Sequence, residues 1–498
     1  MKRNLQGGPG KFFVRGFPAL PSNSPPNPIY GVGGGGLGEG AGVADPWPPP
    51  PINHPPKILI VAGEASGDRH AARLVAAVKE LVPGAEFFGI GGEALAGEGV
   101  RILCPASRLA VVGLLEVAGH LPAVWRALRD LGRALKTERP DLVILVDFPD
   151  FNFWVARLAH LRGVPVMYYI SPQVWAWRTY RVRTIARLVH RMVVIFPFEA
   201  EFYREKGVPV TYVGHPFMDT LPDLPPREEL LRGWGLDPDR LTVALLPGSR
   251  AGEINRHLPI MLAGAALIQQ ALPNCQFLLP LASTAPKELV EGMVMGYLGG
   301  GRGSGAPSPP PKPPSQPFKG LEEGAWERVV NGPVAPGLLP QITIIPGQSY
   351  AALAAADVAA VASGTATVEA ALAAVPTVIV YRISPSSFRV GRMLVRVEHI
   401  GMANLLAGER LFPELLQEDF TAARLAEEVL NWVAHPERLE ALRRGLARLV
   451  EGLGGPGASA RAAQVAVELM QKENCIRGMR YDRHCPWQSF MSRWLTRK

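Results

Sequence analysis

Short apolar runs and helical stretches alternate along the chain from Lys57 onward, and this alternation predicts its architecture. Apolar runs that predict strands lie at 57–62, 85–90, 142–147, 164–169, 192–196 and 210–213. Stretches with apolar residues at helical spacing lie between them, at 66–82, 117–137, 150–162, 178–189 and 198–206. Buried strands that alternate with helices are typical of a parallel sheet covered on both faces.

The same alternation restarts after the Pro-rich stretch Pro216–Pro226, which is typical of a linker. Further strands are expected near 242–246, 276–280, 341–345, 357–361 and 376–381, and helices at 421–434, 436–452 and 458–472. We therefore predict an α/β protein with two Rossmann-like, doubly wound parallel-sheet domains that face a cleft. The expected domains are residues 57–220 and 221–455, followed by a C-terminal helix at 456–473.

Three segments fall outside this pattern, namely residues 1–56, 299–320 and 474–498. The first two are rich in Gly and Pro and bury too little apolar surface to offset their ordering entropy, so we expect them to be disordered. The last is expected to be a basic, poorly specified tail. Residues 1–56 lack the compact apolar core of a signal peptide. Organelle targeting by this segment and a misassigned start codon both stay open.

The charge distribution argues against a nucleic-acid partner. The chain has a net charge of +8, of which residues 1–56 carry +2 and residues 474–498 carry +5, which leaves about +1 for the rest. A nucleic-acid-binding protein is expected to carry its basic surface on the folded body. The chain has no apolar run long enough for a transmembrane helix, and its four scattered cysteines suggest a reducing compartment.

The loop after the 57–62 strand is the first candidate site. It contains Gly63, Glu64, Ser66, Gly67 and Asp68 and leads into a helix, so its backbone N–H groups lie at the carboxyl end of a strand, where open α/β sheets bind ligands. The alternative is a structural turn in which Ser66 or Asp68 caps the helix. The loop matches neither GxGxxG nor a P-loop, so neither a dinucleotide site nor a P-loop triphosphate site is indicated.

Asp147 is the candidate general base, because it ends the 142–147 strand and a carboxylate there points into the ligand crevice. Asp150 and Asn152 follow it, and the alternative is that one of them caps the next helix, which we favour for Asp150.

Two later loops are candidate phosphate sites. Gly248, Ser249 and Arg250 follow the 242–246 strand, and small residues, an arginine and a helix start suit a phosphate. Ser363, Gly364 and Thr365 follow the 357–361 strand and suit a diphosphate, with Glu369 placed to hold ribose hydroxyls. The alternatives are an ordinary turn with an exposed Arg250 and a Glu369 that only complements the helix dipole.

Three other stretches are open to two interpretations. Trp175 and Trp177 either pack or form a sugar platform, and we favour packing. The stretch Leu109–Leu121 is either core or a lipid-facing patch. Asp237 and Asp239 spell a DxD pattern, but their place between a linker and a strand favours a surface turn. No metal site is predicted.

Taken together, the motifs resemble the lipid-A-disaccharide synthase family of glycosyltransferases. The matching segments are AGEASGD (62–68), GIGG with LAVVGLLEV (89–117), DFPDFN (147–152), SPQVWAWR (171–178), GHPFMD (214–219), LPGSRAGEI (246–254), SGTATVEAAL (363–372) and NLLAGERLFPELLQ (404–417). The resemblance covers nearly all of 57–435 and implies a GT-B fold. It also implies that UDP-2,3-diacylglucosamine donates its sugar to the 6-hydroxyl of 2,3-diacylglucosamine 1-phosphate, which gives a β(1→6) disaccharide 1-phosphate and UDP.

The resemblance also implies roles for the candidate residues. Asp147 would be the general base, and Arg250 with Ser249 would stabilise the UDP leaving group. The donor site would further include Gly248, Ser363, Gly364, Thr365, Glu369 and Asn404, although the family usually has Pro where this chain has Ala403. The acceptor side would include Gly63, Glu64, Ser66, Gly67 and Asp68, and the patch Leu109–Leu121 would meet acyl chains.

The expected enzyme inverts the anomeric centre, needs neither metal nor cofactor, and works as a peripheral protein at the cytoplasmic face of the inner membrane. Three alternatives stay open: another GT-B UDP-sugar transferase, a UDP-sugar epimerase, and a nucleotide-diphosphate binding protein without turnover.

Overall fold

The structure is a computed structural model that describes residues 54–109, 117–175, 179–282, 285–298, 340–384, 388 and 399–481. The predicted insertion, nearly all of the N-terminal extension, most of the C-terminal tail, Trp177 and most of the stretch Leu109–Leu121 lie outside these residues. Among the described helices, none is both long enough and apolar enough to cross a bilayer.

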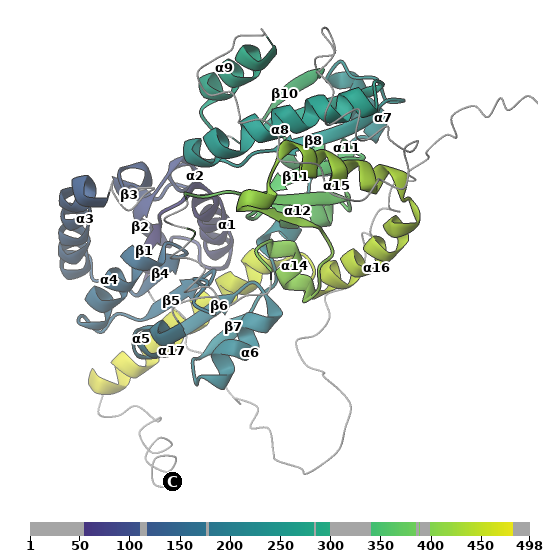
Figure 1. Ribbon diagram of the computed structural model, residues 1–498. Coiled ribbons are helices and arrows are strands. Elements are labelled where there is room, and N and C mark those ends of the chain that lie inside the picture. The colour runs from purple at the N-terminus through teal and green to yellow at the C-terminus, as the bar shows by residue number, and fades with distance from the viewer. Residues whose placement is uncertain are drawn as a thin grey trace, which may run out of the picture. The chain divides into compact units, whose positions relative to one another are not determined.

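The first half of the described chain forms a seven-stranded parallel sheet (Figure 1). Its strand order is β3-β2-β1-β4-β5-β6-β7. The strands are β1 (Lys57–Ala62), β2 (Glu86–Gly91), β3 (Arg101–Pro105), β4 (Leu142–Val146), β5 (Val166–Tyr169), β6 (Arg191–Val194) and β7 (Val210–Tyr212). The strands β1, β4 and β5 are almost entirely buried, which explains why they read as continuous apolar runs.

Six α-helices connect these strands: α1 (Ala65–Leu81), α2 (Glu93–Gly97), α3 (Val117–Thr137), α4 (Pro149–His160), α5 (Val182–Leu188) and α6 (Pro197–Glu205). Successive residues of β1 point to opposite faces, so Ile58 and Ile60 pack with α1 whereas Leu59 and Val61 join the core under α3 to α6. The chain winds outward from β1 to β3 and then from β4 to β7 in the opposite direction. Right-handed crossovers therefore put α1 on one face and α3 to α6 on the other.

The second half forms a six-stranded parallel sheet in the order β10-β9-β8-β11-β12-β13. Its strands are β8 (Leu241–Leu246), β9 (Cys275–Leu281), β10 (Ile342–Pro346), β11 (Val358–Ala362), β12 (Thr377–Tyr381) and β13 (Glu414–Leu416). Its helices are α7 (Arg227–Gly233), α8 (Ala251–Ala271), α9 (Lys287–Leu298), α11 (Ser349–Ala355), α12 (Ala366–Leu372), α14 (Met402–Ala407), α15 (Ala422–Ala434) and α16 (Glu437–Gly452).

The last helix, α17 (Ala458–Tyr481), returns to the first half and packs against α1. Asp219, in the segment that leaves the first sheet, accepts hydrogen bonds from the backbone N–H groups of Gly457, Ala458 and Ser459 at 2.6, 3.0 and 2.8 Å. The Arg461 side chain donates to the carbonyl of Val213 at 2.8 Å. The segment that leaves the first half and the segment that returns to it are thus hydrogen-bonded to each other.

The predicted strands are confirmed to within about two residues, but two edge strands were missed. No residue of strand β3 is buried and β13 has three residues, so neither carries a buried apolar run. The helix predicted over 458–472 continues to Tyr481, so the first residues of the predicted tail are helical. The α/β prediction with two parallel doubly wound sheets is confirmed.

Candidate active site

The predicted site residues, apart from Asn404, lie in or just after four loops that each follow a strand of a parallel sheet. The loops after β1 and β4 belong to the first sheet, and the loops after β8 and β11 belong to the second. In each pair, the two loops follow strands that are direct neighbours in their sheet: β1 lies beside β4, and β8 lies beside β11. Loops at the carboxyl ends of neighbouring parallel strands meet at one edge, so each sheet brings its two loops together.

Asp147 stands on strained backbone directly after β4. Asp147 and the next residue, Phe148, have φ angles of +46° and +45°, in the left-handed region that favours glycine. Each such residue costs about 1 to 2 kcal/mol, and it persists only where its surroundings enforce it. The turn ends β4, starts α4 at Pro149, and leaves the Asp147 side chain half-buried at the sheet edge.

Two side chains hold this strained turn through the Asp147 carbonyl. The amide of Asn152 donates to that oxygen at 2.7 Å and to the carbonyl of Val146 at 3.3 Å. The hydroxyl of Tyr168, at the end of β5, donates to the Asp147 carbonyl at 2.6 Å. Asn152 is fully buried and Tyr168 lies in the core, so both donors are fixed by packing. Sequence reasoning missed Tyr168, because in the sequence this tyrosine looks like any other apolar residue of a buried strand.

The local electrostatics suit a base near neutral pH. Burial raises the pKa of the Asp147 carboxyl to about 6, and the negative charge of Glu64 adds to the effect. A hydrogen bond from the Phe148 backbone and the charge of Arg250 oppose this rise in pKa. A general base works best when its pKa lies near the working pH.

The interpretation of Asp150 as the cap of α4 is wrong. Phe148 occupies the N-cap position, and Asp150 lies in the first turn, where it forms an ion pair with Arg181 at 2.6 Å. The prediction that Ser66 or Asp68 caps α1 is also wrong, because Glu64 is the N-cap residue and no side chain caps it. Asp68 instead accepts hydrogen bonds from the backbone N–H groups of Gly92 and Ala94 at 2.6 and 2.9 Å.

The loop after β1 lies against the loop after β4. A Cβ atom on Gly63 would lie 2.2 Å from the ring of Phe148, so only glycine fits there. Glu64 follows and is half-buried, with its carboxylate 2.9 Å from the guanidinium of Arg250. Glu64 therefore joins a loop of the first sheet to a loop of the second.

The loop after β8 holds Arg250 between two carboxylates. Its guanidinium donates to Glu64 at 2.9 Å and to Glu253 at 3.4 Å. The other oxygen of Glu253 accepts the backbone N–H of Ser249 at 3.2 Å. Gly248 has a φ of +117°, and a Cβ atom there would lie 2.5 Å from the Glu253 carboxylate. The loop thus requires glycine, as a phosphate-binding turn would.

His257 links this loop to the end of β12, and sequence reasoning gave it no role. The ring lies fully buried on α8, with Nδ1 2.8 Å from the carbonyl of Pro247 and Nε2 3.0 Å from the backbone nitrogen of Arg382. Burial lowers the pKa of His257, and the carbonyl at Nδ1 and the backbone N–H at Nε2 suit a ring that donates from Nδ1 and accepts at Nε2.

The loop after β11 contains Ser363, Gly364 and Thr365 and leads into α12. The Ser363 hydroxyl donates to the carbonyl of Ile400 at 2.9 Å, which ties the loop to the start of α14. Burial raises the pKa of Glu369, and the positive charge of Arg69 from the first half opposes this effect. Glu369 lies in the first turn of α12.

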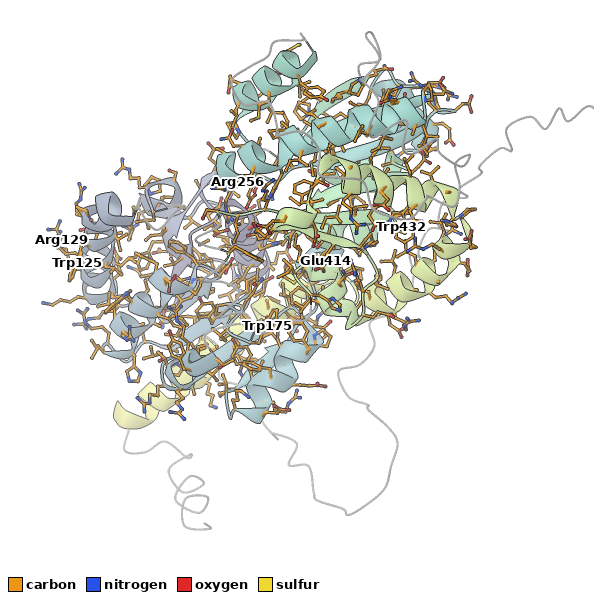
Figure 2. All side chains as sticks on the ribbon, viewed as in Figure 1. Trp125, Arg129, Trp175, Arg256, Glu414 and Trp432 are labelled. Atoms are coloured by element: carbon orange, nitrogen blue, oxygen red, sulfur yellow. The ribbon has the colours of Figure 1, made fainter. Side chains whose placement is uncertain are left out.

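Asn404 lies in a buried network rather than at a surface. Its amide nitrogen donates to the carbonyl of Phe412 and to Glu414, both at 2.8 Å, and its oxygen accepts the Phe412 N–H at 2.9 Å. Glu414 also accepts the backbone N–H groups of Ile400 and Gly401 at 3.0 Å each. Figure 2 labels Glu414, which sequence reasoning missed because a lone glutamate at a strand start carries no pattern.

Trp175 packs against neighbouring side chains, which is the interpretation that we favoured over a sugar platform. Its indole N–H donates to Glu199 at 3.1 Å, and its ring meets Phe198 edge to face at 5.0 Å (Figure 2). Burial raises the pKa of Glu199 to about 8. The DxD pattern forms a turn in which the Asp239 N–H donates to the Asp237 side chain at 3.0 Å, so the surface-turn prediction is confirmed. Within the described residues, no group of three or more His, Cys, Asp and Glu side chains could hold a metal ion.

Comparison with known proteins matches nearly all of the described chain. A family model described as lipid-A-disaccharide synthetase matches residues 58–296 and 335–469. The lipid-A-disaccharide synthases of Geobacter metallireducens and Syntrophus aciditrophicus are each 43% identical over 84% of this chain, which spans 98% and 99% of their lengths. The crystal structure of the glycotransferase of kitacinnamycin shares the fold, with a TM-score of 0.50 at 16% identity over 84% of this chain and 99% of that one.

Proposed function

Because the chain belongs to the lipid-A-disaccharide synthase family, we propose that it joins two acylated glucosamines into a disaccharide. The donor is UDP-2,3-diacylglucosamine, the acceptor is 2,3-diacylglucosamine 1-phosphate, and the products are the β(1→6) disaccharide 1-phosphate and UDP. The observation that carries the proposal is the Asp147 turn. A family motif there places a carboxylate with a pKa of about 6 on backbone held by two buried donors.

Asp147 acts on the acceptor. Its carboxylate takes the proton from the 6-hydroxyl while that oxygen attacks the anomeric carbon of the donor sugar. The bond from the anomeric carbon to the UDP oxygen breaks at the same time, and its electron pair leaves with UDP. Attack from the face opposite UDP inverts the anomeric centre. The acceptor side is lined by Gly63, Glu64, Ser66, Gly67 and Asp68. Asp68 contributes indirectly, because its carboxylate holds the N-terminus of α2 in place by two hydrogen bonds.

The loops of the second sheet bind the donor. Arg250, together with Gly248 and the hydroxyl group of Ser249, stabilises the negative charge that UDP gains as the bond breaks. Ser363, Gly364 and Thr365 hold the diphosphate, and Glu369 accepts hydrogen bonds from the ribose. Asn404 supports this site as a positioning residue, because its amide is already bonded to Phe412 and Glu414.

The proposal also assigns a role to each domain and a location to the enzyme. Residues 57–220 form the acceptor domain and residues 221–455 the donor domain. The acylated substrates place the enzyme at a membrane surface as a peripheral protein, on the cytoplasmic side of the inner membrane. The reaction needs no metal and no cofactor.

The test is UDP release by the purified full-length chain with both acylated substrates. We expect release that depends on the acceptor, survives a chelator, and falls about 100-fold or more in Asp147→Asn. Asp150→Asn is the matched control, because it removes a carboxylate three positions away on the same turn without touching the Asp147 carbonyl network.

Other outcomes separate the alternatives. UDP release without acceptor, or release of a monosaccharide epimer, would indicate another UDP-sugar enzyme. UDP binding without any turnover would indicate a binding protein. Equal rates in Asp147→Asn and Asp150→Asn would remove Asp147 as the base.

A further inference from the structure

The outer face of α3, α4 and α5 is basic and aromatic. Residues 117–190 contain eleven Lys and Arg against five Asp and Glu, a net charge of +6, although residues 57–473 as a whole are close to neutral. The positive charge of the folded part is therefore concentrated on this stretch, and the remainder of that part is net negative.

On α3, the exposed side chains form one stripe opposite the core. Ala127, Leu131 and Leu135 face the sheet, whereas Trp125, Arg126, Arg129, Arg133 and Lys136 point outward. Helical spacing places these five within about 100° of each other around the axis. Figure 2 shows Trp125 and Arg129 on the outer side of α3.

The neighbouring helices continue this surface. Arg162, just after α4, donates to the carbonyl of Gly132 on α3 at 3.1 Å, so the two helices lie side by side. Trp154 on α4 is exposed, with the guanidinium of Arg157 4.9 Å from its ring centre. Arg183 and Arg187 are exposed on α5, which contacts α4.

Large apolar side chains are also exposed here. Seven are exposed in the described part of the chain, and four of them, Trp125 (72%), Trp154 (55%), Leu161 (78%) and Tyr180 (70%), lie on these helices or at their ends. The three helices carry only two carboxylates, which offset part of the charge: Asp130 pairs with Arg133 at 3.4 Å and with Arg129 at 3.7 Å, and Asp150 pairs with Arg181 at 2.6 Å.

We propose that this α3–α5 face, made by Trp125, Arg126, Arg129 and Arg133 with Trp154 and Arg157, docks on an anionic lipid bilayer. Arginines attract acidic headgroups, and amphipathic tryptophan rings settle at the level of the headgroups. A nucleic acid would also match the charge, but it gives no reason for an exposed Leu161 about two helical turns after Trp154. The inference rests on the proposed function, because acylated substrates are held in a membrane.

The face also lies next to the reaction site. In parallel α/β folds each helix starts at the carboxyl edge of the sheet, so the first turns of α3 and α4 begin at the edge that carries Asp147. A bilayer against this face would therefore border the acceptor side of the site.

The experiment measures sedimentation of the full-length chain with phosphatidylcholine vesicles, with and without about one-third phosphatidylglycerol. The test variant changes Arg126, Arg129 and Arg133 to Gln. The control variant changes Arg443, Arg444 and Arg448 to Gln, which removes the same charge from α16, where each arginine pairs with a glutamate.

We expect wild type and the α16 variant to bind only the anionic vesicles, and less at high salt. Each removed arginine should weaken binding about fivefold, so the α3 variant should bind about 100-fold more weakly. Brominated phosphatidylglycerol should quench wild-type fluorescence, and Trp125→Phe and Trp154→Phe should each lose part of that quenching. Circular dichroism and UDP release from detergent-dispersed substrates should be unchanged in the α3 variant.

Four results would overturn the proposal. The first three are no vesicle binding by wild type, an equal loss in the α3 and α16 variants, and unaltered binding by the α3 variant, which would assign binding to another part of the chain. The fourth is tighter binding of a single-stranded RNA that the α3 variant loses, which would assign the face to nucleic acid instead. A wild type that binds vesicles yet releases no UDP would refute the proposed function and leave the docking face in place.

Discussion

The loops after β4 and β8 both lead from a buried strand into a helix, and both contain backbone in the left-handed region. After β8 the left-handed residue is Gly248, which adopts that conformation at no steric cost. After β4 the left-handed residues are Asp147 and Phe148, which pay for it in strain. In the reaction that we propose, glycine suffices in the loop that meets a phosphate. A side chain is required in the loop that transfers a proton, and there Asn152 and Tyr168 hold the turn.

Asp147→Gly tests this difference most strongly. Glycine relieves the strain but removes the carboxylate, so the rate of UDP release should fall about 100-fold or more. The free energy of unfolding should exceed that of Asp147→Asn by about 1 kcal/mol, because both variants lack the charge and only one keeps the strain. Urea unfolding of the two variants side by side measures this difference. Equal stabilities would mean that the turn is not strained.

Gly248→Ala is the converse change on the donor side. A methyl group at a φ of +117°, 2.5 Å from the Glu253 carboxylate, should lower the free energy of unfolding by about 2 to 3 kcal/mol. It should also weaken UDP binding, measured by calorimetry, because Glu253 has to leave Ser249 and Arg250. Gly252→Ala, in the first turn of the following helix α8, is the control, and equal losses in both variants would contradict the assigned role of Gly248.

The pH dependence of stability should differ between wild type and Asp147→Asn. The folded Asp147 has a pKa of about 6 and the unfolded one about 3.9, so the folded state binds the proton more tightly. Between about pH 4 and pH 6 the folded chain therefore holds more protons, and this group lowers stability as the pH rises. The difference in unfolding free energy between Asp147→Asn and wild type should grow by about 2 kcal/mol from pH 4 to pH 7. A constant difference would show that the pKa of Asp147 is not raised.

Tyr168→Phe should give the smallest effect. It removes one hydrogen bond to the Asp147 carbonyl while Asn152 keeps the other, so unfolding should become about 1 kcal/mol easier. The rate of transfer should fall with little change in the KM for the donor, because the tyrosine orients the base and does not meet UDP. Tyr203→Phe, at a buried hydroxyl bonded to Ser171, is the control for loss of a buried hydrogen bond elsewhere. An increased KM for the donor in Tyr168→Phe would contradict the positioning role.

The sequence by itself determined the strand–helix alternation, the two parallel sheets and the loops that carry the site. Apolar runs and small-residue turns are local signals, so β1, β4 and β8 with their loops could be placed from the pattern alone. The short edge strands β3 and β13 could not, because a strand exposed at an edge carries no buried run.

Only the tertiary structure decided which side chains support the site. Tyr168 from β5 and Asn152 from α4 meet at one carbonyl, His257 spans two loops, and Glu414 binds Asn404 across ten positions. Such contacts depend on distance in space. The motifs single out Asn152 and Asn404, but they do not reveal the partners of these residues. The basic face of α3 to α5 also depends on the tertiary structure. Its residues lie on three helices and become one surface only when the helices pack side by side on the sheet.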